Sequence, residues 1–286
     1  DLGDVNVNSI GQSDALVAWN GTTESYRVVL SEEAVAETLW EDYKNYLVDD
    51  TISAESYKLQ GLKSNTKYFV YVKALCDGGA GKWNLQGVDF RTDCADQLPL
   101  PYGEDFDSYP SAASLNPPAC WTLFYNGTMN KEAKYPSVYT NARYNTADTD
   151  DKGLYWYMAT ADSTALRRPT IASLPVDDIS KVTISFQLKT TASTNPSKIA
   201  LGYATDISSI DNLIATVQYV DTIYPSTKWV EYSRDMKDAQ GKNVHIVLSE
   251  LYGKGGPTLY MDNFKVEVTP TCYVPSAQLL ETTYDA

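Results

Sequence analysis

Short runs in which apolar and polar residues alternate recur along almost the whole chain, separated by clusters of Gly, Pro, Asn, Asp and Ser. The run from Val182 to Leu188 is an example, because every second side chain of a β-strand lies on the same face. Stretches with helical spacing are scarce, and the 22 tyrosines favour strands. The pattern predicts an all-β fold made of sandwiches.

The chain length and one proline-rich segment predict two domains. A chain of 286 residues can bury two separate cores. The segment Leu98-Pro99-Leu100-Pro101 cannot continue a central strand, so we place the boundary near Asp96. We expect domains at residues 1–95 and 96–270, with residues 271–286 as a linker or the start of a following repeat.

The charge balance excludes some partners. A formal net charge of −14 argues against nucleic acid and against anionic membrane surfaces, because both need a basic footprint. No apolar run approaches the roughly 20 residues that a transmembrane helix needs. The excess carboxylates remain available for hard cations such as calcium.

One motif in the first domain points to a known family. In the segment Gly61–Ala74, Tyr68 falls on an apolar strand face, and Leu62 anchors the turn before that strand. This segment resembles the tyrosine corner of fibronectin type III domains. Trp19 lies where that family places a core tryptophan, whereas Ser64 replaces the usual proline of the corner. The resemblance implies a fibronectin type III-like sandwich over residues 1–95.

The segment 32–50 departs from that family because it is longer than the usual connection. Its apolar residues, among them Trp40 and Tyr43, have near-helical spacing, which predicts a short helix or an ordered insertion. Trp40 and Tyr43 could face a partner, but we expect a satellite core beneath the loop.

The second domain carries a series of landmarks in a recognisable order. An acidic start at Asp105-Phe106-Asp107 precedes Cys120-Trp121, the strand Ser185–Leu188 and the closing strand Leu259–Val266. This order resembles the MAM-like, concanavalin-like jelly rolls of Bacteroidetes surface proteins, which include the cleaved-adhesin and choice-of-anchor groups. The resemblance implies an adhesive or glycan-associated module, secreted to the extracellular space or the outer-membrane surface, and a monomer within a multidomain array.

The four cysteines indicate an oxidising compartment. None forms a C-x-x-C pair and the chain has one histidine, so a zinc site would lack ligands. Two disulfides are the better interpretation, against the alternative of four buried free thiols. Three connectivities are open. We predict Cys76–Cys94 and Cys120–Cys272, because each bond then closes one domain.

Three carboxylates are candidate calcium ligands. Glu104 and Asp107 lie near the first strand of the jelly roll and Asp262 near its last, and these two strands are adjacent in such a fold. Related jelly rolls hold a structural calcium ion near their termini, so the resemblance supports a Ca²⁺ cofactor here. In the alternative interpretation, Glu104 and Asp107 cap a turn and Asp262 faces solvent.

Aromatic residues are the candidate ligand contacts. In the strand Leu154–Met158, either Trp156 or the pair Tyr155 and Tyr157 must point away from the core, and Tyr139 could add a rim. Exposed rings stack on the apolar faces of sugars. The expected partner is therefore a glycan, or else a host or bacterial surface protein.

Signs of catalysis are weak. His245 lies inside an apolar strand, where a structural histidine is expected, and no Gly-x-Ser-x-Gly motif is present. Glu104 and Asp107 could in principle form a glycosidase pair, but the acidic strand of concanavalin-like glucanases is absent. We therefore predict a non-catalytic adhesion or binding module. A passive spacer is the alternative, and a glycoside hydrolase is the weakest of the three.

Overall fold

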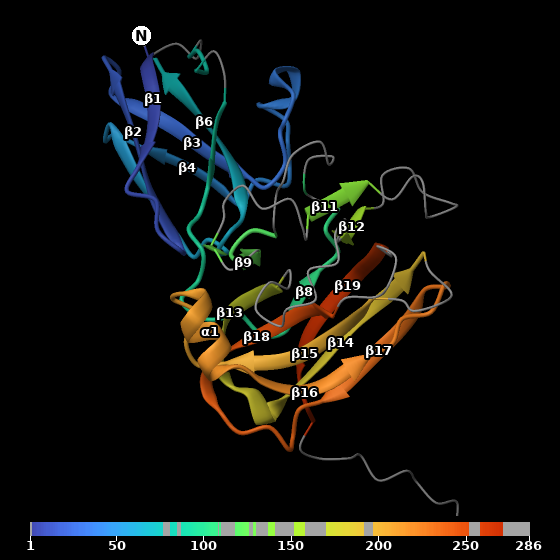
Figure 1. Ribbon diagram of the computed structural model, residues 1–286. Coiled ribbons are helices and arrows are strands. Elements are labelled where there is room, and N and C mark those ends of the chain that lie inside the picture. The colour runs from blue at the N-terminus through green and yellow to red at the C-terminus, as the bar shows by residue number, and fades with distance from the viewer. Residues whose placement is uncertain are drawn as a thin grey trace, which may run out of the picture. The chain divides into compact units, whose positions relative to one another are not determined.

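The computed structural model divides the chain into two compact units, Asp1–Asp96 and Gln97–Ala286 (Figure 1). The predicted following repeat, residues 271–286, lies outside the described residues. The structure describes residues 2–76, 81–84, 87–107, 109, 118–125, 128–129, 137–140, 152–157, 170–191, 197–251 and 258–270.

The first unit is a sandwich of two antiparallel sheets with its core between them. One sheet has three strands in the order β1-β2-β5, namely β1 (Leu2–Asn8), β2 (Asp14–Gly21) and β5 (Ser56–Gln60). The other has four strands in the order β4-β3-β6-β7, namely β4 (Val48–Ile52), β3 (Ser25–Ser31), β6 (Lys67–Leu75) and β7 (Val88–Arg91).

The predicted tyrosine corner is present in this unit. The hydroxyl of Tyr68, which is 1% exposed, accepts a hydrogen bond of 2.8 Å from the backbone N–H of Lys63 in the preceding turn. Trp19 is buried in the same core and packs edge-on against Tyr26, with 5.4 Å between ring centroids. Both landmarks of the fibronectin-like pattern therefore lie in the core.

The long connection between β3 and β4 folds back over the outer face of the four-stranded sheet. It contains a short 3₁₀ helix, η1 (Glu37–Leu39). The next residue, Trp40, is 4% exposed and packs on Tyr71 of β6 at 4.7 Å between ring centroids. Its indole N–H donates to the carbonyl of Val35 at 2.7 Å. The expected satellite core is thus present.

Glu41 connects this insertion to the sheet by accepting hydrogen bonds from several side chains. Its carboxylate accepts hydrogen bonds from Lys73, from the Arg27 guanidinium at 3.0 Å and from the Trp83 indole at 3.1 Å. Arg27 also forms a bidentate pair with Asp49 at 2.7 and 2.8 Å. Exposed ion pairs contribute at most about 1 kcal/mol each, so this network orients the insertion while the aromatic packing holds it.

The second unit is a larger sandwich of two six-stranded antiparallel sheets (Figure 1). The first sheet has the order β10-β9-β13-β18-β15-β16, namely β10 (Thr128–Met129), β9 (Thr122–Tyr125), β13 (Thr170–Asp178), β18 (Lys242–Leu251), β15 (Lys198–Ala204) and β16 (Gln218–Ile223). The second has the order β11-β12-β19-β14-β17, with β8 paired beside β19. Its strands are β11 (Ser137–Thr140), β12 (Lys152–Tyr157), β19 (Thr258–Val268), β14 (Val182–Thr190), β17 (Val230–Asp235) and β8 (Tyr102–Glu104).

Strand β14 shows how the sequence builds this core. Val182, Ile184, Phe186, Leu188 and Thr190 are buried, while the residues between them are only partly covered. The alternation sends one set of side chains between the sheets and the other to the outer face. The fold-class prediction is confirmed: the chain is all-β, with a jelly-roll sandwich after the fibronectin type III-like one.

A single short α-helix among the described residues, α1 (Ile210–Thr216), covers part of the outer face of the first sheet. It begins at Ser209, whose hydroxyl accepts a hydrogen bond of 3.1 Å from the backbone N–H of Asn212. Its Leu213 packs against Phe124 and Val247 of that sheet. Only the other sheet therefore keeps an outer face that no helix of the described chain covers.

The tyrosine corner yields a prediction on stability. We expect Tyr68→Phe to lower the free energy of unfolding by about 1–2 kcal/mol, because it leaves the Lys63 N–H without its acceptor. Equilibrium urea denaturation measures this. Tyr57→Phe is the matched control, since the Tyr57 hydroxyl bonds to Asp50 at an exposed position. Equal losses in both variants would contradict the role of the corner.

Candidate functional site

Glu104, a predicted calcium ligand, is engaged by the protein itself. One of its carboxylate oxygens accepts from the backbone N–H of Phe106 at 2.8 Å, and the other accepts from the Tyr109 hydroxyl at 3.0 Å. Burial raises the pKa of this carboxyl above its usual value, and the two hydrogen bonds offset part of that effect. Glu104 thus helps to form the turn after β8.

The other two predicted ligands have separate partners. Asp107 accepts from the backbone N–H of Lys152 at 2.8 Å, and Asp262 accepts from the backbone N–H of Asn263 at 2.6 Å. Within the described ranges, no group of three or more His, Cys, Asp and Glu side chains could hold a metal ion. The structure therefore does not gather Glu104, Asp107 and Asp262 into one cation site, and bound calcium stays a prediction.

His245 has the structural surroundings expected of it. One ring nitrogen, Nδ1, lies 2.7 Å from the carbonyl oxygen of Ser173 on the neighbouring strand β13. The Ser173 hydroxyl in turn accepts from the backbone N–H of Ile246 at 3.1 Å. These contacts join two core strands of the first sheet.

Of the predicted ligand contacts, Trp156 is wrong. It is 0% exposed, and it lies opposite Leu259 on the face of β12 that points between the sheets. Tyr155 directly precedes Trp156 on the same strand, so its side chain points to the opposite, outer face, where it is partly exposed. The backbones of Tyr157 and Tyr139 belong to β12 and β11, but their side chains are outside the described part of the structure.

Tyr155 begins a row of side chains that crosses the outer face of the second sheet. It pairs with Tyr260 of β19, with 5.3 Å between their ring centroids, and Tyr260 pairs with Lys189 of β14. The Lys189 ammonium lies 5.8 Å from the ring centroid of Trp229, directly before β17. We call these four residues the aromatic row. Tyr260 at its centre is 1% exposed, while Tyr155 and Trp229 at its ends are partly exposed.

Polar side chains adjoin the aromatic row on the same face. Gln187 of β14 pairs with Asp262 of β19. This pair lies two residues along each strand from the pair of Lys189 and Tyr260, and therefore on the same face. Rings supply apolar contact area, and the partly exposed Gln187 amide and Lys189 ammonium supply directional hydrogen bonds. The Asp262 carboxylate, in contrast, is 6% exposed and already accepts from Asn263. Sequence reasoning found only Tyr155, because the other members are brought beside it by strand register.

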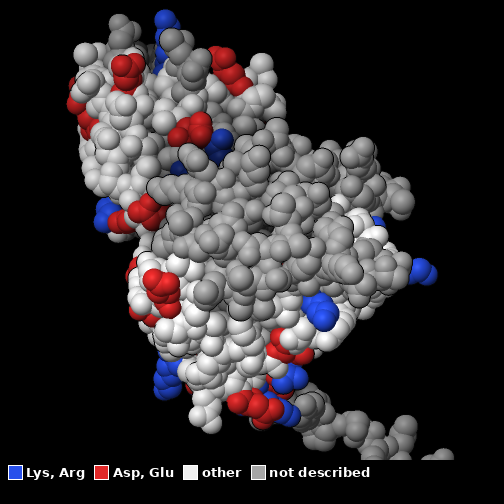
Figure 2. All heavy atoms as spheres, viewed as in Figure 1, with Lys and Arg blue, Asp and Glu red and all other residues white. Residues whose placement is uncertain are grey.

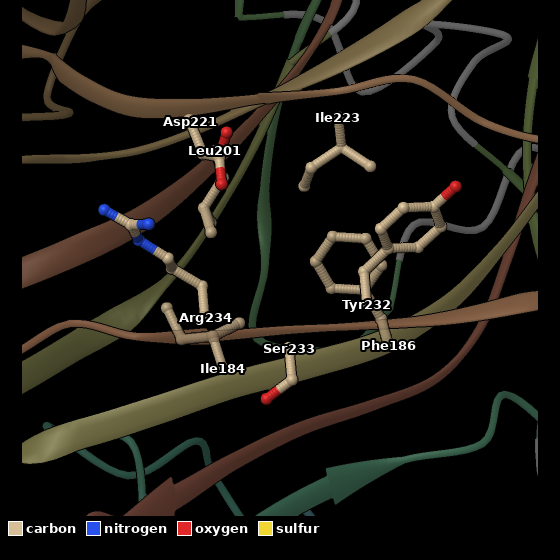
Figure 3. Close-up of a pocket in the computed structure, with 8 residues that line it drawn as sticks. All are labelled: Ile184, Phe186, Leu201, Asp221, Ile223, Tyr232, Ser233 and Arg234. Atoms are coloured by element: carbon tan, nitrogen blue, oxygen red, sulfur yellow. The ribbon is translucent and has the colours of Figure 1, made fainter.

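A pocket opens along the side of the same sandwich where β16 and β17 are edge strands. Its empty volume is ≈ 250 Å³, including space open to solvent, and it is lined by Ile184, Phe186, Leu201, Asp221, Ile223, Tyr232, Ser233 and Arg234. Figure 3 shows Asp221 and Arg234 toward one end of the pocket and Ile223 and Tyr232 toward the other. The pocket is thus apolar within, with opposite charges at one end.

The interior of the second unit also contains a carboxyl group. Glu250 follows Val244, Ile246 and Leu248 on the inward face of β18, and it is 0% exposed. Burial raises its pKa from 4.5 to about 7, although a hydrogen bond from Ser197 favours the ionised form. The carboxyl is therefore largely protonated in the folded protein at mildly acidic pH.

This acid makes stability depend on pH. The pKa of Glu250 is higher in the folded chain than in the unfolded one. Its stabilising contribution to the free energy of unfolding is therefore fully present below about pH 4.5 and is lost as the pH rises to about 7. Between about pH 4.5 and 7.5 this lowers the free energy of unfolding of the wild type by on the order of 3 kcal/mol. We expect that pH-dependent decrease to be absent in Glu250→Gln, whose side chain cannot ionise. Urea denaturation from pH 4.5 to 7.5 measures it. Glu267→Gln, at an exposed position, is the control, and identical pH profiles for wild type and Glu250→Gln would refute the assignment.

The cysteines differ from the predicted pairing. Cys76 is free and exposed, whereas Cys94 and Cys120 are disulfide-bonded. Lys67 at the start of β6 pairs with Arg91 of β7. Cys94 therefore lies near the start of β6 and Cys76 at its far end, roughly 30 Å away at ~3.3 Å per residue. The Cys76–Cys94 bond is wrong, since Cα atoms more than about 7 Å apart cannot be bridged. Cys272 lies outside the described residues.

A peptide map tests the cysteine assignment. We expect digestion without reduction to yield Cys94 and Cys120 only in disulfide-linked peptides, because both are bonded. Cys76 should react with iodoacetamide in the folded protein because it is free and exposed. Recovery of Cys76 in a disulfide-linked peptide would contradict the assignment, whereas a Cys120–Cys272 peptide would bear out that part of the predicted pairing.

Comparison with known proteins agrees with the architecture of the first unit. Residues 2–88 match the family model of the fibronectin type III domain. No curated protein matches the chain. No helix in the described part of the structure is long and apolar enough to cross a membrane.

Solved structures of three kinds are similar to parts of the chain. The FN5 domain of Drosophila Lar has 21% identity and a TM-score of 0.27, covering 33% of this chain and 97% of its own. The K1 cleaved adhesin domain of Lys-gingipain from Porphyromonas gingivalis has 9% identity and a TM-score of 0.42, covering 60% and 100%. The CBM22-1 xylan-binding domain of Paenibacillus barcinonensis Xyn10C has 15% identity and a TM-score of 0.38, covering 63% and 100%. All three scores are below 0.5, and no functional argument rests on them.

Proposed function

We propose that this chain is a non-catalytic extracellular binding module, and that its ligand is a glycan bound on the outer face of the sheet β11-β12-β19-β14-β17. The observation that carries the proposal is the aromatic row beside the pair of Gln187 and Asp262. Tyr155, Gln187 and Lys189 on strands, with Trp229 directly before β17, combine exposed ring surface with directional hydrogen-bonding groups. Tyr260 and Asp262 among them are buried.

The geometry suits an extended, neutral ligand. A sugar ring has an apolar face of C–H groups and a rim of hydroxyls, so it uses both kinds of side chain at once. Tyr155 and Trp229 mark the two ends of the row, and Tyr260 and Lys189 lie between them. Neighbouring strands are about 4.8 Å apart, so the row from β12 to the start of β17 spans three such spacings, the length of a short oligosaccharide.

The surface charge and the cysteines support an extracellular module of this kind. On the face shown in Figure 2, the coloured Lys and Arg side chains lie scattered among Asp and Glu and form no basic patch, which disfavours nucleic acid. The disulfide-bonded Cys94 and Cys120 are typical of an oxidising compartment. A fibronectin type III domain ahead of the sandwich suits a multidomain protein that displays a binding surface.

A glycan array with the purified protein tests the proposal. We expect Tyr155→Ala and Trp229→Ala each to weaken binding by roughly tenfold or more, because each removes one end of the stacking surface. Leu39→Ala is the control, since Leu39 is a large hydrophobic residue 52% exposed in the first unit. Binding that is unchanged in both row variants would refute the site. Silence of the wild type across the array would favour a passive spacer.

A further inference from the structure

Among the described strands, β16 and β17 are edge strands on the same side of the jelly roll. Within that part of the chain each has one hydrogen-bonded neighbour, β15 for β16 and β14 for β17. Three exposed large hydrophobic residues lie on or directly beside them, namely Tyr219, Tyr224 and Val230, at 46%, 63% and 40% exposure. Unpaired strand edges with exposed apolar side chains are templates for pairing with another strand.

The two residues of β16 that line the edge pocket are one acidic and one apolar. Asp221 lies opposite Leu201 and Ile223 opposite Ile199, and both of these β15 residues belong to the core. Asp221 has no salt bridge among the described residues, and its carboxylate accepts a local hydrogen bond from the Thr222 N–H at 2.8 Å.

On β17 the pocket is lined by an apolar ring, Tyr232, and a basic side chain, Arg234, which match the apolar Ile223 and the acidic Asp221 of β16. Tyr232 lies opposite Phe186, with 6.3 Å between ring centroids, and Arg234 lies opposite Ile184. All four of these side chains line the edge pocket. Arg234 also lacks a salt bridge within the described part of the chain.

The order of these residues along the two edges matches. Figure 3 shows Asp221 and Arg234 toward one end of the pocket, and Ile223 and Tyr232 toward the other. The acidic residue of one edge strand therefore lies level with the basic residue of the other. Within one molecule they belong to different sheets, which pack about 10 Å apart.

We propose that this open edge pairs with the same edge of a second copy of the chain, about a two-fold axis parallel to the strands. Such an axis brings β16 of one protomer antiparallel to the partner's β17, and the reverse pairing forms at the same time. Asp221 then lies opposite the partner subunit's Arg234, and Ile223 opposite the partner subunit's Tyr232. Each sheet continues from one protomer into the next.

In this dimer, Asp221 and Arg234 gain partners of opposite charge, and the edge strands gain partners for their backbone groups. Residues directly opposite on neighbouring strands have Cβ atoms about 5 Å apart, which is half the spacing between sheets. The charges thus gain a closer partner, and both edges gain backbone hydrogen bonds. The interface is isologous, so it closes at two copies. It differs from the monomer expected from the sequence.

Inward-pointing charges on edge strands also have an opposite use, because they keep edges from pairing. In that case Asp221 and Arg234 each oppose association, and the protein is a monomer. Exchanging the two charges distinguishes the alternatives. If the edges pair, reversing one charge weakens dimerisation and reversing both restores it; if the charges keep the edges apart, this pattern does not appear.

Sedimentation velocity of the full chain over a range of concentrations tests the dimer. Asp221→Arg and Arg234→Asp each place two like-charge contacts in every dimer. We therefore expect each single variant to weaken dimerisation by at least about a hundredfold, roughly tenfold for each contact. The double variant D221R/R234D should restore dimerisation. Asp211→Arg, an exposed site on α1, is the charge-matched control.

The outcomes separate clearly. A wild type that stays monomeric up to millimolar concentration overturns the proposal. So do single variants that associate like the wild type, or a double variant that is folded by circular dichroism yet does not recover. Loss in both single variants, recovery in the double variant and no change in Asp211→Arg support the paired edge.

Discussion

The packing of two antiparallel sheets against each other is the constraint on which the second unit depends. Each strand must send every second side chain into one shared core, and this alternation decides which residues are left for contact with other molecules. Trp156 and Tyr155 are neighbours in the chain, yet one is fully buried between the sheets and the other lies on the outer face. The aromatic row exists because Tyr155, Tyr260 and Lys189 all lie on that outer face, in register.

Much of the fold followed from local pattern. The alternation in Val182–Leu188 predicted a strand with one buried face, and the motif around Tyr68 predicted the tyrosine corner that the Lys63 N–H completes. Trp40 was expected in a satellite core and is there. These succeeded because strand periodicity, turn chemistry and a local hydrogen bond depend on residues close in sequence.

The failures involve distance across the fold. We predicted a Cys76–Cys94 bond because it would close the first domain, but the two residues lie toward opposite ends of β6. The strand Leu154–Met158 left open which of its aromatics faces outward, and only the neighbouring strand settles it. Strand register brings Lys189 and Tyr260 together from far apart in the sequence, so no local pattern could name the row. Within the described residues, Glu104, Asp107 and Asp262 do not form one group that could hold a metal ion, and bound calcium stays a prediction.

The proposed binding face is the outer face of the sheet β11-β12-β19-β14-β17. A two-dimensional NMR titration with the oligosaccharide that gives the strongest array signal tests it most directly. We expect chemical-shift changes concentrated on β12, β14 and β19 and on the indole N–H of Trp229, with β15 and β18 unchanged. Shifts confined to the edge strands β16 and β17, or to the first unit, would contradict it.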